Sequence, residues 1–304
     1  MHHTGRFRTL LAAGALAAAH MSGPAAATEL VLAQASGSKW IMDNGLNSCR
    51  LAREFGEGED RVFLKLEQWA PGEMLSMLLA GQPLAAFAEQ RMTQIGFGEP
   101  TGPSGLRDRL GYPATLNDRG PAMIFPAVTL TRQSDSSADG SPPVDLWPFL
   151  EAQDMAIADR IQLVQGDDTL RLQAASLPQA LVVLDTCSRA RLTEWGLDAE
   201  AHRTLTRIAW PRNLAQLSER IHNNWPEALL DKGGQGAIHV RMIVEPDGSV
   251  GECTITPMTN SDLPASACRI FARGAKFNPA LDASGAPVRS FWATTVTYTL
   301  ETGE

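Results

Sequence analysis

The residues best suited to chemistry in this 304-residue chain are its four cysteines, Cys49, Cys187, Cys253 and Cys268. A thiol can act as a nucleophile, as a metal ligand or as half of a disulfide. No two of them form a Cys-x-x-Cys pair, and the histidines beyond residue 27 stand alone at His202, His222 and His239. Zinc sites need closer clustering of ligands, so we expect no metal site and no cofactor.

Two stretches come close to catalytic motifs without completing one. Leu181–Ser188 reads LVVLDTCS and is similar to the apolar-Asp-Thr-Gly loop of aspartic proteases, but Cys187 stands where the glycine is needed. Glu57, Glu59 and Asp60 lie in a predicted turn, where water solvates them. The sequence has no nucleophile elbow, Walker loop, His-Glu-x-x-His motif or dinucleotide fingerprint. We therefore expect no catalytic residues and no enzymatic activity.

The N-terminus has the pattern of a secretory signal peptide. Arg6 and Arg8 precede an apolar run from Leu10 to Ala19, and small residues end at Ala27. The run is shorter than the roughly 20 residues that span a bilayer. We expect residues 1–27 to be a cleaved signal and the mature protein to be periplasmic, without a membrane span. An uncleaved anchor, which would leave the protein on the inner membrane facing the periplasm, is the alternative.

The formal net charge of −8 indicates which partners to exclude. An acidic chain of this composition is soluble and poorly suited to binding nucleic acid phosphates. We expect no nucleic acid partner.

The chain after the signal divides into two predicted domains of an α+β protein. Residues 28–38 are of low complexity and predicted to be disordered, and residues 39–200 form a β-rich N-terminal domain. Ile161 and Leu163 alternate opposite Leu170 and Leu172, which predicts a hairpin. A helix follows, with Ser176 and Gln179 as a capping box. The glycines and prolines between residues 96 and 120 predict loops.

The second domain is predicted at residues 222–301, after a linker or helix at residues 201–221. Its first element is a hairpin that turns at Asp247-Gly248, the strongest short turn signal. A helix capped by Ser261 or Asp262 follows, and its apolar stripe contains Leu263, Ala267, Ile270 and Phe271. The last strand runs from about Ser290 to Leu300.

An even number of cysteines in an exported chain predicts two disulfides, although four cysteines allow three pairings. We favour Cys253 with Cys268 and Cys49 with Cys187, because each pair then falls within one predicted domain.

This C-terminal region resembles the C-terminal domain of the TonB energy-transducer family. The matching residues stand in order along the chain: Trp225-Pro226, Gly233, Gly236, Pro246-Asp247-Gly248, Val250, Phe277, Pro279-Ala280, Gly285 and Pro287-Val288. The resemblance implies a three-stranded antiparallel sheet packed with helices, and a domain that binds an extended segment of an outer-membrane receptor by strand addition. The partner-binding residues would then lie on the last strand, at Ser290, Phe291, Trp292, Thr294, Val296 and Tyr298.

The chain also departs from that family. It has no long proline-rich spacer and carries a folded domain instead, for which we recognise no family. Our hypothesis is a periplasmic adaptor that docks an outer-membrane receptor or another envelope protein, and that is linked to TonB-dependent transport.

Three alternatives stay open. The protein could be an exported enzyme or small-ligand receptor with its site in the N-terminal domain, or a transducer held by an uncleaved anchor. The last strand could also be covered, by the first domain or by a second copy in a strand-exchanged homodimer.

Overall fold

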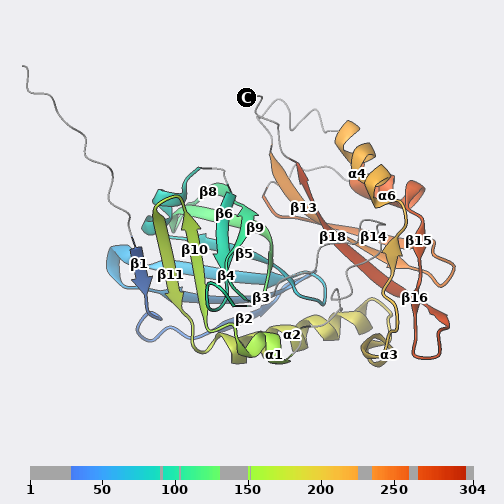
Figure 1. Ribbon diagram of the computed structural model, residues 1–304, viewed down its shortest axis with the longest axis horizontal. Helices are drawn as coiled ribbons and strands as arrows, with labels where there is room; N and C mark the ends of the chain where they lie inside the picture. The colour runs from blue at the N-terminus through green and yellow to red at the C-terminus, as the bar shows by residue number, and fades with distance from the viewer. Residues whose placement is uncertain are drawn as a thin grey trace, which may run out of the picture.

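The computed structural model describes residues 29–89, 92–102, 104–130, 150, 152–224, 235–259 and 266–298 (Figure 1). The predicted signal peptide, the helix cap at Ser261 or Asp262, Leu263, and the Trp225-Pro226 and Gly233 matches lie outside these residues.

The N-terminal domain is built from two β-sheets that share one core, so the β-rich expectation is confirmed. One sheet has the strand order β1-β11-β10-β6-β7, and the other has the order β2-β3-β4-β5-β9-β8. The strands of the first sheet are β1 (Glu29–Leu32), β6 (Met92–Gly96), β7 (Arg107–Leu110), β10 (Arg160–Gln165) and β11 (Asp168–Gln173). Those of the second are β2 (Ile41–Asn44), β3 (Cys49–Phe55), β4 (Val62–Gln68), β5 (Met74–Ala80), β8 (Tyr112–Leu116) and β9 (Gly120–Thr129). The 3-10 helices η1 (Gly58–Asp60) and η2 (Gln82–Phe87) and the short helix α1 (Ala152–Ala156) complete the domain.

Alternating apolar residues explain why the two sheets pack together. On β10, Ile161 and Leu163 pair with Leu172 and Leu170 of β11, as the hairpin pattern predicted. These side chains meet those of β3, β4 and β5 in a single apolar core. The core is continuous between the two sheets.

Two predictions for this domain were wrong. Residues 28–38 were expected to be disordered, but β1 pairs in parallel with β11 and buries Leu32. Residues 96–120 were expected to be loops, yet β7 and β8 lie there. In both cases a long-range strand pairing stabilises a segment whose local composition favours irregular structure.

The long helix α2 (Leu177–Glu194) runs beneath both domains (Figure 1). Leu177, Leu181 and Leu184 pack into the N-terminal core, and Leu192 packs with Ile243 of the second domain. The helix therefore joins the two domains.

The predicted capping box of this helix is wrong. Ser176 makes no side-chain cap to the helix. Its hydroxyl instead accepts hydrogen bonds from Gln34 Nε2 at 3.0 Å, Trp40 Nε1 at 2.9 Å and Arg53 Nη1 at 3.0 Å. The side chain is thus engaged by donors more than a hundred residues away in the sequence.

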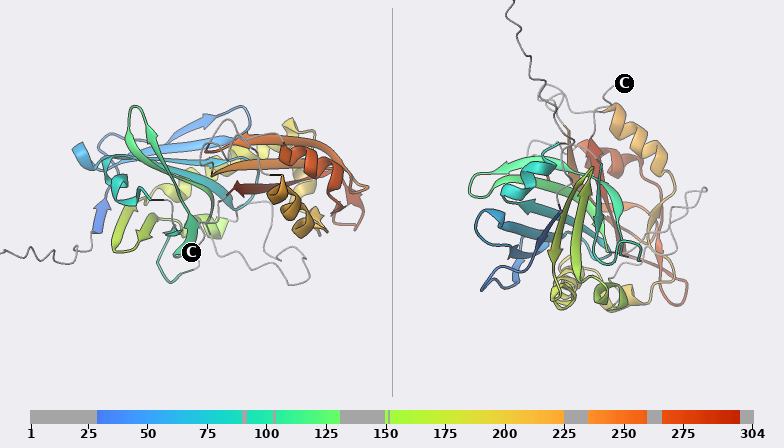
Figure 2. Two further views of the ribbon diagram at one scale, coloured as in Figure 1. Left: turned by 90° about the horizontal axis from the view of Figure 1, so that it is seen from above. Right: turned by 60° about the vertical axis from the view of Figure 1, so that its left-hand side comes forward.

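The C-terminal domain is a three-stranded antiparallel sheet with two helices on one face, as expected. The strand order is β14-β13-β18, and Figure 2 shows the helices beside these strands. The elements are α3 (Ala199–Arg203), β12 (Trp210–Pro211), α4 (Leu214–Asn223), β13 (Gly236–Val244), β14 (Val250–Pro257), α6 (Ser266–Gly274), β15 (Phe277–Asn278), β16 (Ala280–Leu281), β17 (Pro287–Val288) and β18 (Ser290–Tyr298).

The turn between β13 and β14 shows why Asp247-Gly248 is needed. Gly248 has φ +82°, and a Cβ there would lie 2.5 Å from the carbonyl oxygen of Phe277. Glycine is the residue that accepts both constraints.

Residues 201–221, expected to be a linker or helix, are part of the second domain's core. Leu205, Ala209 and Leu217 are buried with the sheet residues Val240 and Met242. This segment packs against the sheet of the second domain and is not a free linker between the domains.

Candidate partner-docking edge

The last strand, β18, lies at one edge of the C-terminal sheet. It pairs with β13 along its whole length, from Ser290 opposite Val244 to Tyr298 opposite Gly236. Within the described ranges, β13 is the one strand that pairs with β18. The opposite edge of β18 therefore offers main-chain N–H and C=O groups that another strand could bind.

The side chains of β18 are divided between two environments. Trp292 packs with Phe271, Phe277 and Trp210 on the helix side, with ring centroids 5.7, 5.7 and 6.3 Å away. Phe291 on the other face contacts Trp195 at 5.7 Å between centroids.

Most of the side chains that we predicted to bind a partner are not free to do so. Ser290, Trp292, Val296 and Tyr298 are buried, and Phe291 and Thr294 are half-buried. The Ser290 hydroxyl lies 3.1 Å from Nε2 of His202. The part of the strand that is left without a strand partner in the described residues is its outer backbone edge, and the buried side chains hold that edge in place.

Two hollows lie end to end along this edge. The first, of about 100 Å³, touches Ser290, Phe291, Trp292 and Ala293. The second, of about 280 Å³, touches Thr294–Tyr298. Side chains on a strand alternate between its faces, so a hollow that touches consecutive residues lies along the edge. Together the two hollows follow all of β18.

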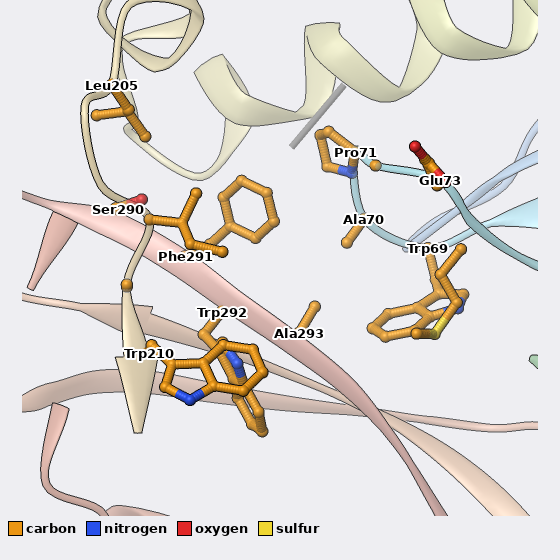
Figure 3. Close-up of a pocket in the computed structure, with 14 residues that line it drawn as sticks. Trp69, Ala70, Pro71, Glu73, Leu205, Trp210, Ser290, Phe291, Trp292 and Ala293 are labelled. Atoms are coloured by element: carbon orange, nitrogen blue, oxygen red, sulfur yellow. The ribbon is translucent and has the colours of Figure 1, made fainter. Parts of the chain in front are cut away.

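The first hollow is lined by both domains (Figure 3). Trp69, Ala70 and Pro71 come from the connection between β4 and β5, Met74 is the first residue of β5, and Leu205, Ile208 and Trp210 come from the segment before α4. The stretch Trp69–Met74 is called the Trp69–Met74 connection below. The second hollow is walled by Leu214, Ser218, Ile221 and His222 of α4 and by Phe271 of α6. We did not predict any of these wall residues as site residues, and no sequence motif marks them.

The second face of the C-terminal sheet is covered by the N-terminal domain. Every residue of β13 is buried. His239 stacks on Trp69, and the guanidinium of Arg241 lies 3.9 Å from the centroid of Trp195. The Thr295 hydroxyl donates to Met74 Sδ at 3.6 Å. The alternative of a covered strand thus holds for one face of β18, while its edge is left without a paired strand in the described part of the chain.

Burial and charged neighbours together shift the pKa values of the ionisable groups at this junction. Burial lowers the pKa of His239 to about 3, so the ring is neutral. The pKa of Glu67 is lowered to about 2, because Lys65, Ser48 and Arg50 outweigh the opposing effect of burial. Desolvation also lowers the pKa of Arg241.

Glu67 is therefore a structural anion. Its carboxylate accepts hydrogen bonds from Ser48, from Arg50 at 3.0 Å and from Lys65 at 3.0 Å. A carboxyl group held ionised in this way has no proton to donate as an acid catalyst near neutral pH.

The four cysteines form the two disulfides that we favoured. Cys49 on β3 is joined to Cys187 on α2, and Cys253 on β14 is joined to Cys268 on α6. The stretch LVVLDTCS is helical, which separates it from a protease loop. The described residues contain no group of three or more potential metal ligands and no helix long and apolar enough to cross a membrane.

Residues 221–300 match the family model described as the Gram-negative bacterial TonB protein C-terminal. The chain therefore carries a TonB-like domain, and the resemblance seen in the sequence is confirmed. The matched region contains β13, β14, α6 and β18 and covers about a quarter of the chain. No curated protein and no solved structure matches the chain.

Proposed function

We propose that this chain is a TonB-like envelope protein that acts in the periplasm as a non-enzymatic docking module. It binds an extended segment of an outer-membrane receptor or another envelope protein by strand addition along β18. The observation that carries the proposal is the outer edge of β18, which is followed over its whole length by two hollows. A strand that adds to a sheet lies about 4.8 Å from its neighbour, and the two hollows lie beside the β18 residues with which it would pair.

The N-terminal domain supports a docking function over an enzymatic one. Its two sheets enclose one continuous apolar core, and its most strongly shifted carboxylate, Glu67, is held by three donors. The domain is also packed on the sheet, through Trp69 on His239 and Met74 on Thr295. We infer that it holds the docking edge rigid and is not a flexible spacer, so the protein does not itself transmit force as an energy transducer would.

The proposal is tested by photo-crosslinking in a Gram-negative envelope. A benzoylphenylalanine at Thr297, which is exposed on β18, should give a discrete crosslinked product. The matched control places the same residue at Val182, which is 50% exposed on α2. Mass spectrometry of the product identifies the partner segment, and that segment as a free peptide should compete with crosslinking.

Equal products from both positions would contradict docking at β18. A product made only of this chain would identify a strand-exchanged homodimer. Hydrolytic or transfer activity in the purified chain, abolished by a change in the N-terminal domain, would favour an enzyme instead.

A further inference from the structure

The first hollow has walls on both faces of β18, and this sets it apart from the second. The connection Trp69–Met74 stands on the face that Thr295 shares, since Thr295 bonds to Met74. Trp210 stands on the opposite face, where its ring meets Trp292 edge to face. Figure 3 shows the labelled residues of the two segments with the β18 residues between them.

A strand that adds beside Ser290–Ala293 would therefore be enclosed on both faces. Its side chains would point alternately toward the Trp69–Met74 connection and toward Trp210. The lining of both walls is mainly apolar, with Glu73 as its one charged residue, and a strand buried on two such faces needs a continuous run of apolar residues. The edge supplies main-chain partners at the same place, which a compact apolar molecule could not use.

A strand bound along the second hollow would need a different pattern of side chains. Beside Thr294–Tyr298 the wall comes from the helix side, through Leu214, Ile221 and Phe271. On the other face Thr297 is exposed. A strand added there would have one apolar face and one face in water, and its residues would alternate.

We propose that the two domains jointly bind the partner segment. This segment carries two adjacent apolar side chains, followed or preceded by a stretch in which apolar and polar residues alternate. One of the pair contacts the Trp69–Met74 connection of the N-terminal domain, and the other contacts Trp210. This inference rests on strand addition at β18, and it makes the N-terminal domain a part of the binding site.

The test is a fluorescence-anisotropy titration of the full mature chain with labelled nonapeptides. The host peptide alternates threonine and valine, and the second peptide contains one added Val-Val pair. A third replaces one valine of that pair by aspartate, and a fourth is the second with alternate backbone nitrogens methylated. We expect the paired peptide to bind more than tenfold tighter than the host, and the aspartate peptide to lose that gain. Because only the peptides differ, folding of a variant does not enter this comparison.

A protein variant assigns the pair to the first hollow. Ala70→Trp fills the hollow from the N-terminal side and should bring the paired peptide and the host to similar affinities. Val182→Trp, on the exposed face of α2, is the control and should change neither. The circular dichroism spectrum of each variant checks its fold.

The outcomes separate this inference from strand addition itself. If the methylated peptide binds as well as its parent, or if no peptide binds, strand addition fails. Strand addition stands, but the proposal that both domains bind the segment is overturned, in two cases. In the first, peptide binding is lost on backbone methylation but the Val-Val pair adds no affinity. In the second, Ala70→Trp has no effect on the affinity of the paired peptide. If sedimentation shows a dimer whose formation excludes the peptides, the occupant is a second copy and the inference is also overturned.

Discussion

The indole of Trp69 stacks on the imidazole of His239 with ring centroids 4.0 Å apart and an interplanar angle of 11°. Trp69 follows strand β4 of the N-terminal domain, and His239 lies in the middle of β13, the central strand of the C-terminal sheet. The Trp69 side chain also lines the hollow beside β18. One aromatic pair therefore joins the two domains and borders the outer edge of β18, which is the proposed docking edge.

Removal of this stacking should destabilise the whole chain. Trp69 is buried, and truncation of a buried tryptophan costs about 3–5 kcal/mol. We expect Trp69→Ala to lower the free energy of unfolding by that amount in chemical denaturation. Val182→Ala, at an exposed position, should change it by less than about 0.5 kcal/mol. A loss below about 1 kcal/mol for Trp69→Ala would show that the two domains are held together by other contacts.

Acid should weaken the same junction. Burial lowers the pKa of His239 from 6.5 to about 3, so the folded protein favours the neutral ring and the unfolded chain binds the proton more readily. The contribution of His239 is therefore complete above pH 6.5 and falls as the pH drops from 6.5 toward 3. Since one pKa unit corresponds to about 1.4 kcal/mol, the loss at pH 5 should be about 2 kcal/mol.

The check is denaturation of the wild type and of His239→Gln at pH 7.5 and pH 5. Gln has no proton to gain, so the variant should be less sensitive to acid by that amount. His202, whose pKa burial also lowers, remains in both proteins and cancels from the comparison. Thr295, Trp69 and the Glu67 carboxylate face the ring, and the charge of Glu67 opposes the shift. Identical pH dependence in the two proteins would show that His239 is not the group that titrates.

The two disulfides should contribute unequally to stability. The bond between Cys49 and Cys187 spans 138 residues, and that between Cys253 and Cys268 spans 15. By chain entropy the longer loop contributes about 5 kcal/mol and the shorter about 3 kcal/mol. The paired serine variants Cys49→Ser/Cys187→Ser and Cys253→Ser/Cys268→Ser, unfolded in urea, should differ in that order. A larger loss from the second pair would mean that strain or residual structure dominates over loop length.

Export should change the mass of the protein through cleavage of the signal peptide and formation of the disulfides. We expect the chain recovered from a periplasmic extract to begin near Thr28 and to gain four hydrogen atoms on reduction. Intact mass spectrometry before and after reduction measures both quantities. A full-length, membrane-retained product with free thiols would contradict the signal peptide and would favour an anchored transducer.

The sequence by itself determined the elements that depend on near neighbours. Alternation along β13, the turn at Asp247-Gly248 and the apolar stripe through Ala267 and Phe271 specify the sheet and helix of the second domain, because strand and helix periods are local properties. The ordered set of family residues then identified this domain. The cysteine pairing followed from assigning each cysteine to a domain.

Only the tertiary structure decided where these elements meet. Strand β1 pairs with β11, which lies about 140 residues later in the sequence. Ser176 accepts hydrogen bonds from Gln34, Trp40 and Arg53 across similar separations. The walls of the hollow at β18 come from Trp69–Met74, Leu205–Trp210 and the last strand. No periodicity or motif connects three such distant segments, because their proximity results from how the two cores pack on each other and on α2. The proposed docking edge could thus be predicted as a strand, but its surroundings could not.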